Sequence, residues 1–170
     1  LNTEFPEAHY NLGWSFQELN ENDNALEQYE AVVFLDPNNQ DAYFQMGEIH
    51  ESARRHNEAV LAFQKVVAIN PDFVEGHVRL GSNYAKQGQA KEALAKFEDA
   101  LRINPKLEDT YFQLGVTFGE LRRFEEGLDA LKKALVLNPD HLGTLLKMGK
   151  FNSILGNYQA AVKNLNQLLI

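Results

Sequence analysis

The sequence predicts an all-α fold in which pairs of helices repeat in tandem, and three observations support this fold class. Four prolines and five glycines recur at intervals of 34 residues: Pro37, Pro71, Pro105 and Pro139, and Gly13, Gly47, Gly81, Gly115 and Gly149. Each interval contains two apolar stripes with helical spacing. No stretch alternates apolar and polar residues as a strand would, so no strand is expected. A fixed period of this length is typical of stacked repeats.

The first helix of each repeat is predicted from residues at spacings of three, four and seven. The stripes are His9, Leu12, Gly13, Phe16; Tyr43, Met46, Gly47, His50; His77, Leu80, Gly81, Tyr84; Tyr111, Leu114, Gly115, Phe118; and Leu145, Met148, Gly149, Asn152. A glycine inside a helix costs about 1 kcal/mol of helix propensity. Its return in every copy indicates a site where two helices must pack closely.

The second helix follows a short break. Gly88 is expected to end the first helix because glycine tolerates a positive φ, and Gly156 stands at the same place, whereas Asn20, Arg54 and Arg122 replace it elsewhere. Asn-Pro or Asp-Pro ends the second helix in most copies, because proline disfavours helical backbone before it. The second stripes are Ala25, Tyr29, Val32; Ala59, Phe63, Val66; Ala93, Phe97, Ala100, Leu101; Gly127, Leu131, Ala134; and Ala161, Leu165, Leu168.

Composition excludes several classes of protein. The formal net charge is −8 and the pI about 5.1, which argues against nucleic acid as a partner because such surfaces need clustered Lys and Arg. No apolar run approaches the roughly 20 residues of a membrane span, so no membrane insertion is expected. The chain has no cysteine, which excludes disulfides and thiolate chemistry but does not identify a compartment.

No motif points to catalysis, a cofactor or a metal. The glycine-rich phosphate-binding motifs are absent. No two of the five histidines are four residues apart, and there is no HExxH motif. Three of the five, His9, His50 and His77, lie in the predicted core stripes. The sequence therefore predicts a protein that is not an enzyme, with no cofactor and no metal site.

This pattern of a large residue, Leu-Gly, an aromatic residue, then Ala, another aromatic residue, a small residue and Pro resembles the tetratricopeptide repeat family. The resemblance covers the chain as five copies in register, at about 6–39, 40–73, 74–107, 108–141 and 142–170, the last incomplete; residues 1–5 resemble the tail of a preceding copy. It implies one array that forms a right-handed superhelical solenoid. Because Leu168, Leu169 and Ile170 have no covering helix after them, we expect a fragment of a longer array.

The resemblance also implies a function, a non-catalytic scaffold that holds a peptide or partner helix in a concave groove. In the family, the second, fifth, sixth and ninth residues of the first helices face that groove. The candidate binding residues at these places are Glu7, Tyr10, Asn11, Trp14, Asp41, Phe44, Gln45, Glu48, Arg79, Phe112, Gln113, Lys147 and Lys150.

Other roles are open for some of these residues. Carboxylates at the second position also complement the helix dipole, and aromatic residues at the fifth position also suit packing against the next copy. Trp14 has no packing role in the pattern and suits a binding anchor. Acidic residues dominate the first two copies (Glu7, Glu18, Asp41, Glu48 and Glu51), whereas Lys147 and Lys150 reverse the sign in the fifth. The expected ligand is therefore an apolar-aromatic peptide with a basic end, lying over the first two copies.

Binding of acidic chaperone tails is not expected. The five places that clamp a terminal carboxylate in that subclass hold Tyr10, Trp14, Gln45, Glu75 and Arg79 here, and only Arg79 fits. Two alternatives to the peptide scaffold stay open. One is a regulatory or substrate-selecting arm of a larger enzyme such as a glycosyltransferase, and the other is self-association through uncovered ends.

Overall fold

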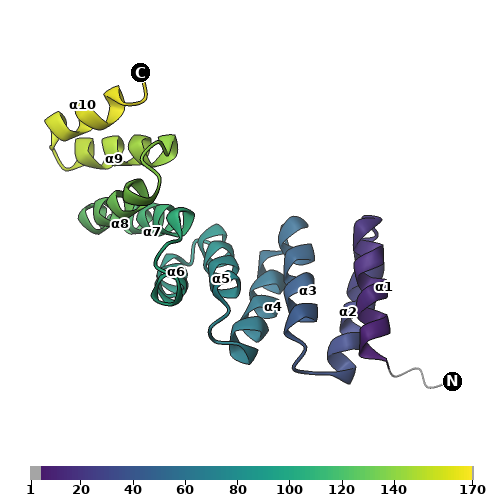
Figure 1. Ribbon diagram of the computed structural model, residues 1–170. Helices are drawn as coiled ribbons and strands as arrows, with labels where there is room; N and C mark the ends of the chain where they lie inside the picture. Colours follow the sequence, from purple (N-terminus) through teal and green to yellow (C-terminus); the bar gives the residue numbers. More distant parts are fainter. Residues whose placement is uncertain (1–4, 170) are drawn as a thin grey trace. The chain divides into compact units, whose positions relative to one another are not determined.

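The computed structural model describes residues 5–169, which form ten α-helices and no strand (Figure 1). The helices are α1 (Pro6–Glu18), α2 (Asn22–Leu35), α3 (Gln40–Ser52), α4 (His56–Ile69), α5 (Val74–Lys86), α6 (Ala90–Ile103), α7 (Glu108–Glu120), α8 (Phe124–Leu137), α9 (Leu142–Ile154) and α10 (Tyr158–Asn166). The predicted all-α fold class of consecutive helix pairs is confirmed. The predicted repeat boundaries stay a prediction, and the assignment of residues 1–4 to the tail of a preceding copy lies outside the described residues.

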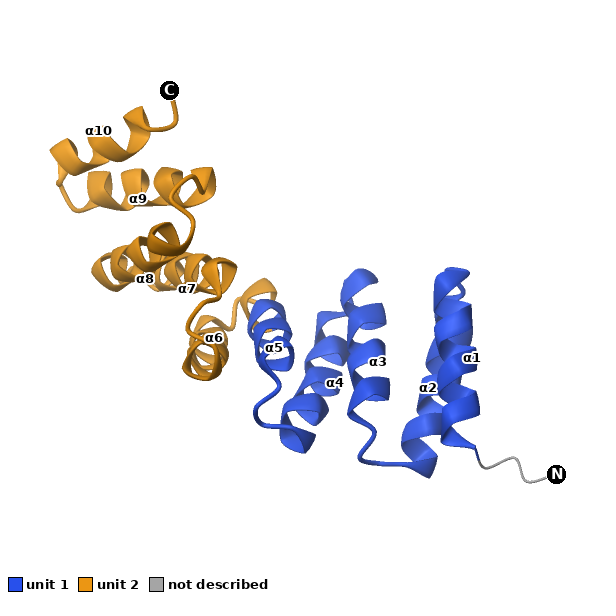
Figure 2. Cartoon of the chain, in the orientation of Figure 1, with its two compact units in different colours: residues 1–83 blue, residues 84–170 orange. Residues whose placement is uncertain are grey.

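The chain forms two compact units, residues 1–83 and residues 84–170 (Figure 2). The first unit contains α1 to α4 and α5 as far as Asn83, and the second contains the last turn of α5 and α6 to α10. We call the odd-numbered helices first helices and the even-numbered ones second helices, because each odd-numbered helix begins a pair.

In unit 1, α1 packs against α2, α2 against α3, and α3 against α4. One core cluster joins α2 and α3 through Tyr29, Val32, Ala42 and Ile49, which are almost fully buried. Phe63 and Val66 of α4 are also fully buried. His56 at the start of α4 is 2.9 Å from the amide oxygen of buried Asn83 in α5. Second helices therefore hold each first helix in place.

Unit 2 is built in the same way, with α6 against α7, α7 against α8, α8 against α9 and α9 against α10. Phe97 of α6 and Phe118 of α7 lie in one core cluster, and Leu131 of α8 and Phe151 of α9 lie in another. The aromatic or large aliphatic residue of each second helix thus fills the space beside the neighbouring first helices.

The repeated glycine of α1, α3, α7 and α9 lies where the helix meets its own second helix. A methyl group added at Gly47 would be 2.6 Å from the ring of Phe63, and one added at Gly115 would be 2.7 Å from Leu131. The corresponding distances are 2.9 Å from Gly13 to Tyr29 and 2.6 Å from Gly149 to Leu165. These distances are too short for a side chain, which confirms the predicted packing reason.

The turn between first and second helix keeps a left-handed residue whether or not it is glycine. Gly88 and Gly156 have φ values of +73° and +77°, and Asn20, Arg54 and Arg122 have values of 60°, 58° and 59°. Left-handed backbone costs a residue with a β-carbon roughly 1–2 kcal/mol. The helix packing therefore imposes the turn geometry even where the sequence does not favour it.

Two sequence expectations differ from the structure. Leu12, assigned to a core stripe, is 45% exposed. In α3, α7 and α9 this helix face lies against the preceding second helix, and no helix precedes α1 among residues 5–169. The last helix was expected to reach Leu168 and beyond, but α10 ends at Asn166. The backbone N–H groups of Leu168 and Leu169 instead donate to residues three positions earlier, which is a tighter turn. Ile170 lies outside the described residues.

No helix within the described part of the chain is both long enough and apolar enough to span a lipid bilayer.

Candidate functional site

The residues predicted to face a groove lie on the first helices, and they differ in how far their side chains are exposed. In unit 1, Glu7, Asn11 and Trp14 of α1 are exposed, and Trp14 is 54% exposed. Gln45 and Glu48 of α3 are half-buried. The exposure of Trp14 agrees with the absence of a packing role in the sequence pattern. We call this side of α1, α3 and α5 the first-helix face of unit 1.

The aromatic residues at the fifth position are partly structural. The Tyr10 ring lies 5.5 Å from that of Tyr29, measured between centroids. The Phe44 ring lies 5.6 Å from Phe63 and 5.4 Å from Phe73. In unit 2, Phe112 lies 4.9 Å from the ring of His141. Each is half-buried, so these side chains support the helix pairs and present only part of their surface to a ligand.

Arg79 already has three carboxylate partners. Its guanidinium lies 2.8 Å from Glu75 one turn earlier in α5, 3.3 Å from Glu51 and 3.5 Å from Glu48, both in α3. The sequence placed Arg79 as a candidate contact for a ligand. In the structure it contacts a group of three carboxylates, and its contact with a ligand stays a prediction.

The environment of this group changes its proton affinities. Burial raises the pKa of the Glu48 carboxyl; the positive charge of Arg79 lowers it, and the charges of Glu75 and Glu51 raise it again. Burial lowers the pKa of Arg79, but its hydrogen bond to Glu75 and the nearby carboxylates outweigh burial and leave that pKa raised. Glu48 is therefore a carboxylate that would gain from one more cation.

Next to this group the surface is hollowed. A pocket of about 380 Å³ is lined by Gln17, Asn22, Glu48, Ile49, Glu51, Ser52 and Arg79. We call it the acidic pocket. It lies where the end of α1 and the start of α2 meet α3, and its walls are polar apart from Ile49.

A second hollow in unit 1 has a volume of about 360 Å³ and is lined by Pro6, Glu7, Tyr10, Asn39 and Asp41. It brings together three of the predicted site residues, Glu7, Tyr10 and Asp41. Burial, followed by the charges of Asp41 and Glu48, raises the pKa of the Tyr10 hydroxyl. The group therefore stays protonated at neutral pH and can donate a hydrogen bond.

In unit 2, a pocket of about 410 Å³ lies where the end of α7 and the start of α8 meet α9. We call it the basic pocket. Its lining is Val116, Gly119, Glu120, Arg122, Phe124, Lys147, Lys150, Phe151 and Ile154. The lining contains three cations and one carboxylate, and its other residues are mostly apolar. It brings the two predicted lysines together.

The remaining predicted residues, Asn11, Trp14, Phe44, Gln45, Phe112 and Gln113, line none of these three pockets. Several lining residues were missed by the sequence analysis, among them Gln17, Ser52, Gly119 and Ile154. Helical spacing could have identified them, because these residues continue the predicted helix face by one further turn. The residues that begin the second helices, Asn22 and Phe124, could not have been identified in this way.

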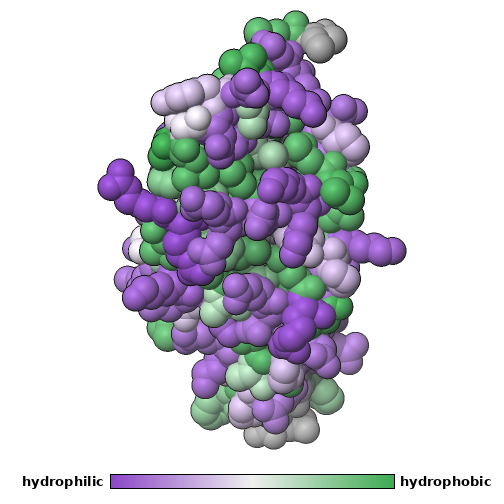
Figure 3. All heavy atoms as spheres, turned by 90° about the vertical axis from the view of Figure 1, so that its left-hand side faces the viewer, coloured by the Kyte–Doolittle hydropathy of each residue, from purple (hydrophilic) through white to green (hydrophobic). Residues whose placement is uncertain are grey.

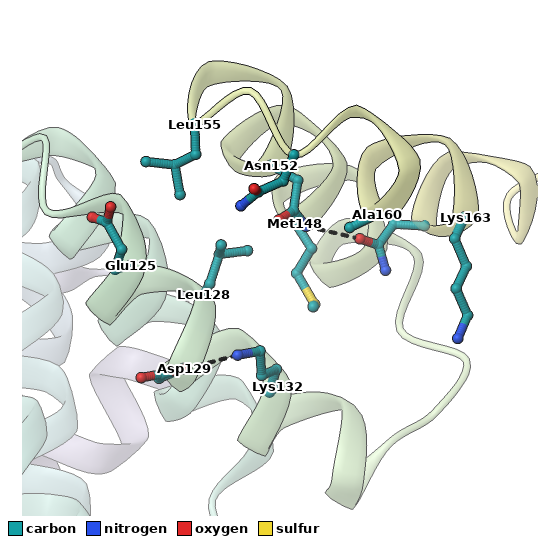
Figure 4. Close-up of a pocket in the computed structure, with 11 residues that line it drawn as sticks. Glu125, Leu128, Asp129, Lys132, Met148, Asn152, Leu155, Ala160 and Lys163 are labelled. Carbon is teal, nitrogen blue, oxygen red and sulfur yellow. Dashed lines mark hydrogen bonds and ion pairs between the residues drawn. The ribbon is translucent and has the colours of Figure 1, made fainter.

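A larger hollow of about 650 Å³ lies between α8, α9 and α10 (Figure 4). Its apolar residues are Leu128, Met148, Leu155 and Ala160, and charged and amide groups surround them. Lys132 is paired with Asp129 at 2.9 Å, and the Asn152 amide donates to Asn164 at 3.1 Å. Charges of both signs line this hollow, so its chemistry favours no particular ligand.

No group of three or more metal-ligating side chains that could hold an ion occurs among residues 5–169. On the face seen in Figure 3, hydrophobic patches alternate with hydrophilic side chains. The candidate functional surface is therefore the first-helix face of each unit, with its pockets.

Similar proteins agree with the architecture. Three family models of tetratricopeptide repeats match the chain, over residues 10–72, 81–122 and 108–141. Among solved structures, MamA superimposes with a TM-score of 0.90 at 22% identity, over 93% of this chain and 92% of that chain. MamA of Desulfovibrio magneticus RS-1 gives 0.89 at 21% identity, over 96% and 93%.

A third structure is YrrB, described as a TPR protein with an unusual peptide-binding site. It gives a TM-score of 0.89 at 22% identity, over 98% of this chain and 86% of that chain. No curated protein matches the sequence. The periodic prolines and glycines, the ten helices and the matches from residue 10 to residue 141 agree, and the chain belongs to the tetratricopeptide repeat family.

Proposed function

We propose that the protein is a non-catalytic interaction scaffold whose first-helix face in unit 1 holds a peptide segment of a partner protein. The segment is apolar and aromatic with a basic end. The observation that carries this proposal is the acidic pocket, whose lining includes the carboxylates of Glu48 and Glu51 beside Arg79. A basic side chain entering the pocket would lie beside the Glu48 carboxylate, whose charged form burial disfavours and a cation would stabilise.

Two further features support a peptide as the ligand. Trp14, at the ninth position of α1, is 54% exposed, and an exposed tryptophan suits an anchor because it buries a large area on binding. Asn11 and Gln45 offer amides that can pair with an extended backbone. A family neighbour, YrrB, is described as having a peptide-binding site, which makes the same class of ligand reasonable for this chain.

The test is a titration of a basic-aromatic peptide library against the wild type and the Trp14→Ala variant. Loss of the tryptophan should weaken binding by about 2 kcal/mol, the scale of an interface hot spot. Phe34→Ala is the matched control, since Phe34 lies on α2 and is 84% exposed. Trp14 is a cleaner probe than Phe44, whose ring packs against Phe63 and Phe73.

The control should bind the library as the wild type does. If peptides bind but none loses affinity in Trp14→Ala, the ligand does not lie over α1 and the proposal is wrong.

A second candidate function is association between copies of the chain. The observation that favours it is the apolar exposure on α1, directly after α1 and on α10, where Leu12, Leu19 and Val162 are 45%, 66% and 57% exposed. Light scattering at rising protein concentration tests it. Growth of the molecular mass that Leu12→Ser and Leu19→Ser abolish would support association, and a constant monomer mass up to millimolar protein would exclude it.

A further inference from the structure

We propose that the basic pocket of unit 2 binds an acidic segment of a partner protein, in which a side-chain carboxylate stands beside a large apolar residue. The inference rests on the proposed function, because it assumes that first-helix faces receive partner segments. It adds a second site with the opposite charge preference.

The cations of this pocket are available. Lys147, Lys150 and Arg122 have no ion-pair partner among residues 5–169, and Glu120 is the single carboxylate in the lining. Some cations elsewhere in unit 2 do have partners close in sequence: Lys96 and Arg102 pair with Asp99, Lys132 with Asp129 and Arg123 with Glu126. The charge of the basic pocket is thus left for a ligand, and a carboxylate is the complementary group.

The apolar lining determines the second half of the ligand. Ile154 is 50% exposed, Phe124 and Val116 are half-buried, and Phe151 is 5% exposed. The Phe124 ring lies 5.3 Å from that of Phe151, so the wall is already packed. A large apolar side chain placed there would bury Ile154 without needing the pocket to reorganise, which is the property of a preformed site.

Comparison with the acidic pocket shows that the fold does not require the side chains that line the basic pocket. Three periods along the chain, Gln17, Asn22, Glu48, Ile49 and Ser52 correspond to Gly119, Phe124, Lys150, Phe151 and Ile154. The same place in the repeat is polar and acidic in one unit and apolar and basic in the other. The backbone is equivalent, so the side chains alone set the partner chemistry.

The probe is an array of short peptides with acetylated and amidated ends, each carrying Asp or Glu beside Leu, Ile or Phe. A second array has Lys in place of the acidic residues, and a third keeps the acidic peptides but leaves the C-terminal carboxylate free. Affinities for the complete 170-residue chain are measured by fluorescence anisotropy at low and physiological salt. The blocked acidic peptides should bind, and more weakly at higher salt.

Reversing both charges in Lys147→Glu/Lys150→Glu should weaken the blocked acidic peptides at least tenfold, and Ile154→Ser should weaken them severalfold. Lys65→Glu/Lys91→Glu is the matched control, since both residues are exposed and lie on α4 and α6, outside the pocket. It should bind as the wild type does. Circular dichroism and thermal melts check that each variant is folded.

The inference is overturned if no blocked acidic peptide binds, if binding survives the double charge reversal, or if the control weakens it equally. It is also overturned if only peptides with a free C-terminal carboxylate bind. The basic-aromatic peptides of the Trp14 experiment report separately on unit 1. Their failure alone rejects the proposed function of unit 1, whereas failure of the acidic array rejects only the site in unit 2.

Discussion

The acidic pocket of unit 1 and the basic pocket of unit 2 occupy the same place in the repeat and carry opposite charges. Each lies where the end of one first helix and the start of its second helix meet the next first helix. Glu48 stands in the former where Lys150 stands in the latter, and Ser52 where Ile154 stands. The acidic pocket contains its own counter-ion in Arg79, whereas the lysines of the basic pocket have none among the described residues.

This difference separates two tasks of the sequence. The glycines, prolines and large second-helix residues return at every period because they set the helix packing. The exposed residues of the first helices do not affect that packing and are free to vary from copy to copy. A repeat protein can therefore present different chemistry along one chain without changing its frame.

The largest expected effect is on stability, and it tests whether the helices of the two units pack in the same way. Gly47→Ala and Gly115→Ala should each lower the free energy of unfolding by about 2 kcal/mol or more, because the added methyl group overpacks the core. It would meet Phe63 at 2.6 Å in one unit and Leu131 at 2.7 Å in the other. Denaturant unfolding followed by circular dichroism measures the change.

Gly143→Ala is the matched control. Its methyl group would approach His141 no closer than 3.3 Å, and alanine raises helix propensity by about 1 kcal/mol. No loss of stability is expected. If Gly47→Ala has the wild-type free energy of unfolding while Gly115→Ala is destabilised, the helices of the two units do not pack in the same way.

A smaller effect is expected on peptide affinity when the counter-ion of the acidic pocket is removed. Arg79→Gln removes the counter-ion of the acidic pocket, so the affinity of a basic peptide should rise severalfold at low salt, about 1 kcal/mol. Peptide titration measures it. Arg102→Gln is the control, because Arg102 is paired with Asp99 on an exposed surface of α6. A fall in affinity in Arg79→Gln would mean that Arg79 contacts the ligand directly, as the sequence pattern suggests.

The affinity of a basic peptide for the acidic pocket should change a few-fold with pH, whereas the affinity of an acidic peptide for the basic pocket should not show this change. The pKa of Glu48 is raised above its ordinary value of 4.5, first by burial. A bound cation would lower that pKa, so binding of a basic peptide releases protons. Affinity should be full above the raised pKa and should fall as pH drops through it. Titrations between about pH 4 and pH 7 measure this, and Glu48→Gln should flatten the profile.

The smallest effect concerns the turns that join the helices. Arg54→Gly should stabilise the protein by about 0.5–1 kcal/mol, because glycine adopts the left-handed backbone without strain. Arg54 has φ of 58°. Gly88→Ala should destabilise it by about 1 kcal/mol, although a methyl group there would meet nothing within 4 Å. Thermal melts would measure both, and unchanged melting temperatures would show that turn strain contributes nothing.

The fold could be predicted because its determinants repeat. Gly13, Gly47 and Gly115 occupy the same position in the 34-residue period, and each faces a large residue of its own second helix. The exposure of Leu12 could not be predicted from that pattern, because it depends on whether another helix covers α1 and not on local spacing.

The candidate site was predictable only in part, for a physical reason. Residues such as Glu48 and Lys150 follow from helical spacing, since one face of a helix collects fixed positions. The partners of Arg79 do not follow from spacing, because Glu48 and Glu51 come from α3 and reach it only after packing. The packing of Phe44 against Phe73 is likewise tertiary.

The central claim, that equivalent pockets in the two units receive segments of opposite charge, is tested most directly by amide chemical-shift mapping on the uniformly ¹⁵N-labelled chain. Basic-aromatic and blocked acidic peptides are added in separate titrations. We predict that the basic peptide shifts amides around Gln17, Glu48 and Ser52, and that the acidic peptide shifts those around Gly119, Lys150 and Ile154. Both peptides shifting the same set of amides, or each shifting the other pocket, would contradict it.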